Sequence, residues 1–243
     1  MIVDTESERQ LRFSDHALQS RMRLDDPYAL VAAYTRQMMS FLLFDPDPKH
    51  ILLIGLGGGS LAKFCRRRLP YTRITVVEID EGVIALRNSF HIPPDDRRFD
   101  VVHADGAHYL SMLNEQVDAI LIDAFDEGGV SPSLMTERFF RDARRCLTHT
   151  GVMIMNLHGD PARFAPQLAH ARAVFTTRML LASVTNADNV LLCAFGEDAP
   201  SPSDKHLFLR ARHLQSKLRL NFRIYLRRMR EGEKLESALQ RRC

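Results

Sequence analysis

The chain has 243 residues, of which 45% are hydrophobic and 26% charged, as in an ordinary globular protein. We find no run of eighteen apolar residues, and the first ten residues are polar and acidic. We therefore expect neither a membrane span nor a secretory signal, and we predict a cytoplasmic location. The net charge of +3 is uneven, because residues 205–243 carry +9 and leave the rest at −6. An acidic body suits a small cationic substrate better than nucleic acid.

Residues 1–48 are predicted to form a small unit on the substrate side of the main domain. Strand-like runs at 9–13 and 18–24 flank a Ser-Asp-His turn and predict a hairpin. Asp-Asp-Pro at 25–27 offers a helix start, and an apolar period then predicts a helix from Tyr28 to about Phe44. The alternative is that residues 1–48 form only a lid packed on the sheet, with no part in binding the substrate.

The stretch from Lys49 to Asp80 predicts a strand, a tight turn, a helix and a second strand. The apolar run 51–54 is typical of a strand buried on both faces. Four glycines then lead into a helix near Ser60: Gly55, Gly57, Gly58 and Gly59. The next strand ends in Glu78, whose carboxylate can accept hydrogen bonds from both hydroxyls of a ribose. This spacing predicts a nucleoside site in residues 49–196.

Strands and helices continue to alternate after Asp80, which indicates an α/β fold with a mainly parallel sheet covered by helices. Further strands are expected at 100–103, 119–122, 152–156, 178–184 and 190–195, and helices at 81–89, 108–113, 133–147 and 161–174. The last two strands are too close for a crossover and must be antiparallel, which completes a sheet of seven strands. Three carboxylates at strand ends are then expected at one edge, where such sheets bind ligands: Glu78, Asp105 and Asp123.

Residues 197–243 are predicted to be a Pro/Ser-rich linker followed by one basic amphipathic helix. Its apolar stripe recurs every three or four positions: Leu207, Ala211, Leu214, Leu218, Phe222, Tyr225 and Met229. We favour docking of this helix on its own domain or on a second copy, and we expect a homodimer. Contact with nucleic acid or an acidic membrane is the less favoured alternative.

Two carboxylates, Asp123 and Asp126, follow the predicted strand 119–122 in the segment IDAFDEGG. Such a pair can hold a cationic amine, and one member can accept its proton so that the free lone pair attacks an electrophilic carbon. A solvated acidic loop or a helix cap explains the same spacing. His103, Asp105 and His108 could suggest a metal site, but none is expected. His103 lies within a strand pattern, and Asp105 is better explained as one of the carboxylates at the ligand-binding edge.

The order of the motifs ILLIGLGGGSL, VVEID, HADGAHYL and ILIDAFD, with ALQSRM and YTRQM upstream, resembles the spermidine synthase (polyamine aminopropyltransferase) family. The resemblance covers residues 11–156 and is nearest to the shorter bacterial members. It implies a Rossmann-like, class I methyltransferase fold. It also implies transfer of an aminopropyl group from decarboxylated S-adenosylmethionine to a polyamine such as putrescine, which leaves methylthioadenosine.

The resemblance also implies roles for individual residues. Asp123 would be the catalytic proton acceptor. The substrates would be bound by Gln19, Tyr34 and Asp126. The nucleoside of the co-substrate would be bound by Gly55, Gly57, Glu78, Asp105 and Gly106.

Two departures from the family pattern leave alternatives open. Gly58 stands where the family's glycine loop carries an aspartate that binds the amino group of the donor, and Thr35-Arg36 replaces His-Glu after Tyr34. A guanidinium suits a donor that keeps its carboxylate, so an S-adenosylmethionine-dependent methyltransferase is the nearest alternative. A catalytically silent nucleoside-binding or scaffold protein is another. An NAD-binding oxidoreductase is disfavoured by the terminal hairpin and by DAFD.

Overall fold

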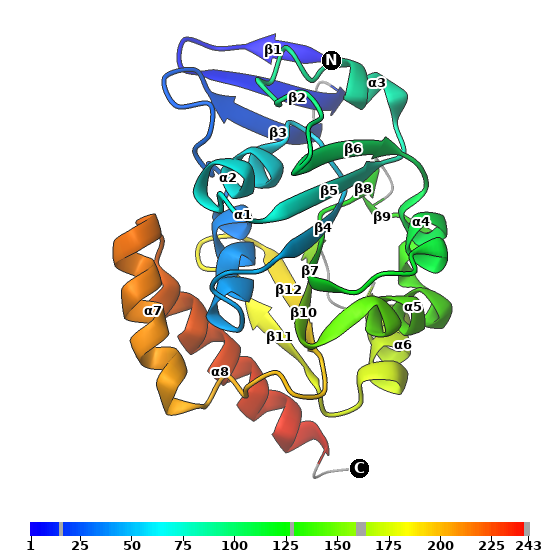
Figure 1. Cartoon of the computed structure of the whole chain (residues 1–243), viewed down its shortest axis with the longest axis vertical. Coiled ribbons are helices and arrows are strands. Elements are labelled where there is room, and N and C mark those ends of the chain that lie inside the picture. The colour runs from blue at the N-terminus through cyan, green and yellow to red at the C-terminus, as the bar shows by residue number, and fades with distance from the viewer. Residues whose placement is uncertain (15–16, 127–128, 159–163, 241–243) are drawn as a thin grey trace.

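The computed structural model describes residues 1–14, 17–126, 129–158 and 164–240. Its centre is a seven-stranded sheet with the order β11-β12-β10-β7-β4-β5-β6 (Figure 1). The strands are β4 (His50–Ile54), β5 (Arg73–Glu78), β6 (Phe99–His103), β7 (Val117–Ile122), β10 (Leu147–His158), β11 (Met179–Ser183) and β12 (Asn189–Phe195). From β6 to β10 the neighbours are parallel, whereas β12 is antiparallel to β10 and to β11. The predicted parallel sheet with a terminal hairpin is confirmed.

Both faces of the sheet are covered, which explains the continuous apolar runs of its central strands. Along β4, Ile51 and Leu53 enter one core cluster while Leu52 and Ile54 enter the other, because successive side chains point to opposite faces. On one face lie α4 (Gly106–Met112), α5 (Glu137–Cys146) and α6 (Ala165–Phe175). On the other face lie α2 (Ser60–Arg68) and the N- and C-terminal helices (Figure 1).

Two of the helices predicted between the strands of the main sheet differ from the observed ones in length or continuity. The helix expected at 81–89 is α3 (Glu81–Ala85), which Asp80 caps by accepting from the backbone of Gly82 and Val83. The helix expected at 133–147 is divided into a short 3₁₀ helix, η2 (Pro132–Met135), and α5. Thr136 causes the division, because its backbone is extended while its hydroxyl accepts from the Phe139 N–H to cap α5.

The N-terminal unit is a three-stranded antiparallel sheet of β1 (Ile2–Asp4), β2 (Glu8–Ser14) and β3 (Ala17–Arg23). The predicted hairpin corresponds to β2 and β3, and the short β1 was missed. The helix expected from Tyr28 begins later, as α1 (Ala33–Met38) followed by the 3₁₀ helix η1 (Met39–Leu43). The start at Tyr28 was therefore wrong, although the segment ends where expected.

The predicted single C-terminal helix is wrong, because the chain forms two helices, α7 (Lys205–Leu218) and α8 (Phe222–Gln240). Arg219 adopts a left-handed conformation (φ 56°, ψ 36°) that ends α7. The apolar stripe continues through this break because both helices bury it in the same cluster of the protein's own core. No helix in the described part of the chain is both long and apolar enough to cross a membrane.

Lys63 of α2 is fully buried and joins the N-terminal sheet to the main domain. Its Nζ donates to the carbonyl oxygen of Phe90 at 2.6 Å and contacts Sδ of Met22, in β3, at 3.1 Å. Burial disfavours the charged ammonium and lowers the pKa of Lys63 from 10.5 to about 8. The folded protein thus releases this proton at a lower pH than the unfolded chain does.

We expect the contribution of Lys63 to stability to rise with pH. Between pH 8 and pH 10.5 the unfolded chain keeps a proton that the folded protein has lost, so the free energy of unfolding increases by roughly 3 kcal/mol across this window. In urea unfolding, the free energy of unfolding of the wild type should rise by this amount relative to that of Lys63→Met from neutral pH to pH 10.5. A difference that is independent of pH would contradict the depressed pKa.

Candidate active site

The glycine turn after β4 brings the backbone against Asp123, at the end of β7. Gly55 has a φ of 97°, and a Cβ there would lie 2.2 Å from the Asp123 carbonyl oxygen. Only glycine fits this position, because it needs both the positive φ and the close approach. Gly57, with a φ of 49°, continues the turn into α2.

Glu78 ends β5 and is held over this turn by two backbone donors. Its Oε2 accepts from the Leu56 N–H at 2.8 Å, and its Oε1 accepts from the Asp80 N–H at 3.0 Å. The residue is only 8% exposed. Each carboxylate oxygen keeps a further lone pair, so the group can still accept from a ligand hydroxyl.

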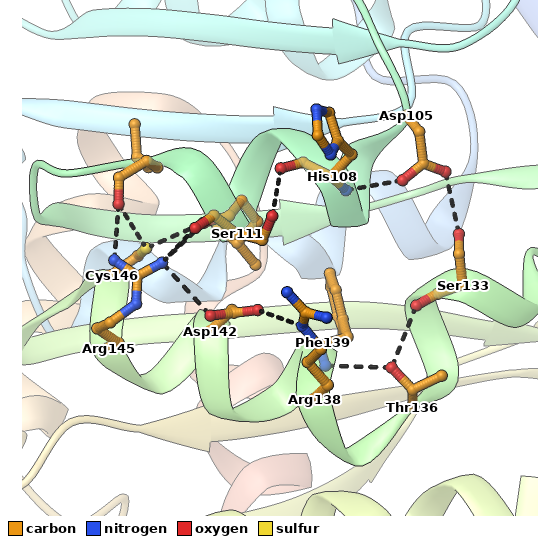
Figure 2. Close-up of polar contacts among 12 residues, drawn as sticks. Asp105, His108, Ser111, Ser133, Thr136, Arg138, Phe139, Asp142, Arg145 and Cys146 are labelled. Carbon is orange, nitrogen blue, oxygen red and sulfur yellow. Dashed lines mark hydrogen bonds and ion pairs between the residues drawn. The ribbon is translucent and has the colours of Figure 1, made fainter.

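Asp105 and Gly106 form the next wall of this edge, at the start of α4. Asp105 caps the helix by accepting from the His108 N–H at 2.7 Å, and its other oxygen accepts from the Ser133 hydroxyl at 3.1 Å (Figure 2). Gly106 is buried, and a Cβ there would lie 2.4 Å from Cγ2 of Ile54. Asp105 is thereby tied to two segments at once.

Arg145 of α5 holds the other end of α4. Its guanidinium donates to the carbonyl oxygens of Leu110 and Leu113, at 3.0 and 2.7 Å, where the helix ends (Figure 2). The Leu110 carbonyl also accepts from the Leu113 N–H, which closes the last turn. The wall that carries Asp105 is therefore fixed at both ends.

Ile79 is a residue of this edge that the sequence analysis missed. It follows Glu78 directly and is 62% exposed, although most large apolar side chains around it are buried. Its carbonyl oxygen lies 3.1 Å from Nε2 of His103, which fixes the strand end. The sequence offered one sign of Ile79, namely an apolar residue directly after the carboxylate in VVEID. Together with Glu78 it offers a flat ligand one apolar and one polar contact.

Asp123 is half-buried at the end of β7 and has two side-chain partners. Its Oδ1 accepts from Nδ2 of Asn156 at 3.0 Å, and it is also hydrogen-bonded to the hydroxyl of Tyr34, in α1. Burial raises the pKa of Asp123, and the two hydrogen bonds oppose that rise. Burial, then the negative charge of Asp123, raises the pKa of Tyr34, so the phenol stays protonated and donates. A carboxylate in such surroundings can act as a general base.

Gln19 and Asp126 are the other predicted substrate-binding residues. Gln19 is half-buried in β3, next to Ser20, whose side chain lies against Gly58. Asp126 belongs to β8 (Phe125–Asp126), which pairs antiparallel with β9 (Gly129–Val130). Glu127 lies outside the described residues. The roles of Gln19 and Asp126 stay predictions.

The two residues that depart from the family pattern after Tyr34 have structural roles. The hydroxyl of Thr35, which is 3% exposed, donates to the carbonyl oxygen of Ala32 at 2.8 Å. Arg36 donates to the carbonyl oxygen of Leu30 at 2.9 Å. Positions two apart on a helix point about 200° apart, so Arg36 faces away when Tyr34 faces Asp123. Arg36 therefore gives no support to a donor that keeps its carboxylate.

Within the described ranges, no group of three or more His, Cys, Asp or Glu side chains is arranged to hold a metal ion. The described cysteines, Cys65, Cys146 and Cys193, are buried free thiols.

Comparison with solved structures defines the class of protein. Human methyltransferase-like protein 13, solved in complex with SAH, is 24% identical, with a TM-score of 0.68 over 77% of this chain and 93% of that one. A probable spermidine synthase from Corynebacterium glutamicum is 20% identical, with a TM-score of 0.69 over 88% of this chain and 86% of that one. The fold is therefore the class I methyltransferase-like fold, which methyltransferases and spermidine synthases share.

Sequence similarity then gives the family. The model of the spermine/spermidine synthase domain matches residues 31–162. A polyamine aminopropyltransferase from Chromobacterium violaceum is 37% identical over 224 residues, which cover 92% of this chain and 86% of the relative. The chain belongs to the spermine/spermidine synthase family and is a transferase, which confirms the family resemblance of its motifs.

Replacing Gly58 tests how tightly β3 packs on the glycine turn. In Gly58→Ala the new Cβ would lie 2.7 Å from the Ser20 hydroxyl oxygen and 3.1 Å from a ring carbon of Phe90. Overpacking of this kind costs about 1–3 kcal/mol, which urea unfolding can measure. Ser20→Gly removes the nearest atoms, so Gly58→Ala should cost less in that background than in the wild type. Strict additivity of the two substitutions would show that β3 does not constrain the turn.

Proposed function

We propose that this protein transfers an aminopropyl group from decarboxylated S-adenosylmethionine to a polyamine and releases methylthioadenosine. The observation that carries the proposal is the half-buried Asp123, hydrogen-bonded to Tyr34 at the sheet edge that bears Glu78 and Asp105. Membership in the spermine/spermidine synthase family supports the same reaction.

The donor fits the strand ends of the sheet. Glu78 would accept from the ribose hydroxyls, since each of its oxygens has one backbone donor and room for another. Asp105 and Gly106 would border the adenine, and the exposed side chain of Ile79 would cover one face of the ring. Gly55 and Gly57 let the backbone approach the rest of the nucleoside.

The proposed reaction is a direct displacement at the carbon next to the sulfonium. The lone pair of the amine nitrogen forms the new C–N bond while the C–S bond breaks and leaves its electron pair on sulfur. The proton released from nitrogen passes to the carboxylate of Asp123, whose raised pKa favours acceptance. Tyr34, Gln19 and Asp126 would hold the amine, so the protein contributes mainly orientation and a base.

A homodimer and a cytoplasmic location stay predictions from the sequence.

Donor preference tests the reaction type. Calorimetric titration with decarboxylated S-adenosylmethionine, S-adenosylmethionine and methylthioadenosine should show that the decarboxylated donor binds more tightly than the carboxylated one. The reason is that Arg36 faces away from Asp123 and donates to the backbone before α1. Tighter binding of S-adenosylmethionine would move the assignment to methyl transfer. Binding without turnover for any amine would support a silent nucleoside-binding protein.

Asp123→Asn should lower kcat by at least about 100-fold, because the amide cannot accept the proton. Donor affinity should change little, since Glu78 and the glycine turn are untouched. Asp188→Asn, at an exposed position before β12, is the matched control and should keep wild-type turnover. Full activity in Asp123→Asn would remove Asp123 from the mechanism.

A further inference from the structure

A pair of buried amides reaches Asp123 from the antiparallel end of the sheet. Asn156 of β10 is 3% exposed and Asn189 of β12 is 9% exposed. Nδ2 of Asn156 donates to Oδ1 of Asp123 at 3.0 Å, and Nδ2 of Asn189 donates to Oδ1 of Asn156 at 2.9 Å. Asn189 of β12, Asn156 of β10 and Asp123, directly after β7, thus form a continuous hydrogen-bonded row across three neighbouring strands.

The chemistry of the three groups fixes the direction of this row. An ionised carboxylate only accepts, so Asn156 must turn its NH₂ group toward Asp123 and its oxygen away. That oxygen then needs a donor, because a buried acceptor without one costs free energy. Asn189 supplies the donor and thereby holds the Asn156 amide in the orientation that serves Asp123.

The helix that carries Tyr34 is anchored to the same part of the sheet. Gln37, one turn further along α1 and 1% exposed, donates through Nε2 to the carbonyl oxygen of Ser183 at 2.9 Å. Ser183 ends β11, and the next residue, Val184, donates its N–H to the carbonyl oxygen of Asn189 at 3.1 Å. Asp123 is therefore held by Tyr34 on one side and by Asn156 on the other, and both supports meet at β11 and β12.

We propose that Asn156 and Asn189 are positioning residues for the base: Asn189 orients the amide of Asn156, and Asn156 holds one oxygen of Asp123 so that the carboxylate faces the amine. The inference rests on the proposed function, which gives Asp123 its task. The hydrogen bond from Asn156 also favours the charged carboxylate and lowers the pKa that burial raises. Loss of this bond should therefore leave Asp123 harder to ionise.

Among the described residues, the titratable groups that bear on the row are Tyr34, Arg21 and His158. Tyr34 faces Asp123 from α1, and Arg21 of β3 acts on the Tyr34 hydroxyl through its charge. His158 lies two residues beyond Asn156, opposite Asn189 in the strand register, and is exposed. None of these groups is altered by replacing Asn156 or Asn189 with leucine, so a change in the titration of Asp123 would report the amide row.

The test measures the pKa of Asp123 in the ligand-free protein by carboxyl ¹³C NMR, with Asp123→Asn to assign the resonance. Asn156→Leu should raise that pKa by about one unit. Asn189→Leu should raise it by less, because the Asn156 amide then remains but is free to turn. In turnover assays the acid limb of kcat/KM should move upward in the same order, and kcat should fall roughly tenfold for Asn156→Leu.

Ile154→Val is the matched control, because Ile154 is fully buried on the same face of β10 and its side chain cannot hydrogen-bond to either amide. It should lower the melting temperature and leave the Asp123 pKa and the acid limb unchanged. A folded Asn156→Leu protein with an unaltered Asp123 pKa would overturn the proposal. If Asn156→Leu does not fold, an unaltered pKa in Asn189→Leu overturns it instead. If the wild type shows no aminopropyl transfer but its Asp123 pKa shifts in these variants, the proposed function fails and the positioning role stands.

Discussion

The site depends on the burial of the central strands on both faces. Inside β4, β5 and β7 nearly every side chain must be apolar, because helices cover the sheet above and below. Polar groups can therefore reach a ligand mainly where these strands end. Glu78 and Asp123 stand at the end of β5 and directly after β7, and Gly55 brings the turn between them within reach of both. The same burial that stabilises the sheet thus gathers its reactive groups at one edge.

Most of the fold could be predicted from the sequence, because its signals are local. Apolar runs, glycines and cap residues identify β4, α2, β5 and the strands that follow. The start of α1 and the break after α7 could not be found in this way. The periodicity of residues 207–229 continues through Arg219, since α7 and α8 bury their stripes in one cluster, so a period alone cannot show that the chain turns. The expectation that Arg36 could bind a donor carboxylate failed for a similar reason. The motif shows that Arg36 lies near Tyr34 in the sequence, but it does not show the direction in which its side chain points.

The support of Asp123 was harder to predict than Asp123 itself. The DAFD segment and its place after an apolar strand pointed to Asp123. Asn156 and Asn189 lie 33 residues apart and meet only through the register of β10 and β12. One signal was available, since Asn156 interrupts the apolar run VMIMNL, and a polar residue in such a strand needs a partner. The sequence does not identify that partner, because it depends on which strand lies beside β10 in the sheet.

The position of β12 between β10 and β11 has a consequence for how the protein folds. The antiparallel strand that carries Asn189 enters the sheet beside β10 and follows all of the parallel strands along the chain. Contacts between segments as distant as Tyr34 and Asn189 close long loops, and such loops are slow to form. The contact between the glycine turn and Glu78 joins β4 and β5, which are much closer in the sequence. Full orientation of Asp123 therefore depends on the docking of β12, which brings Asn189 to Asn156 across the sheet.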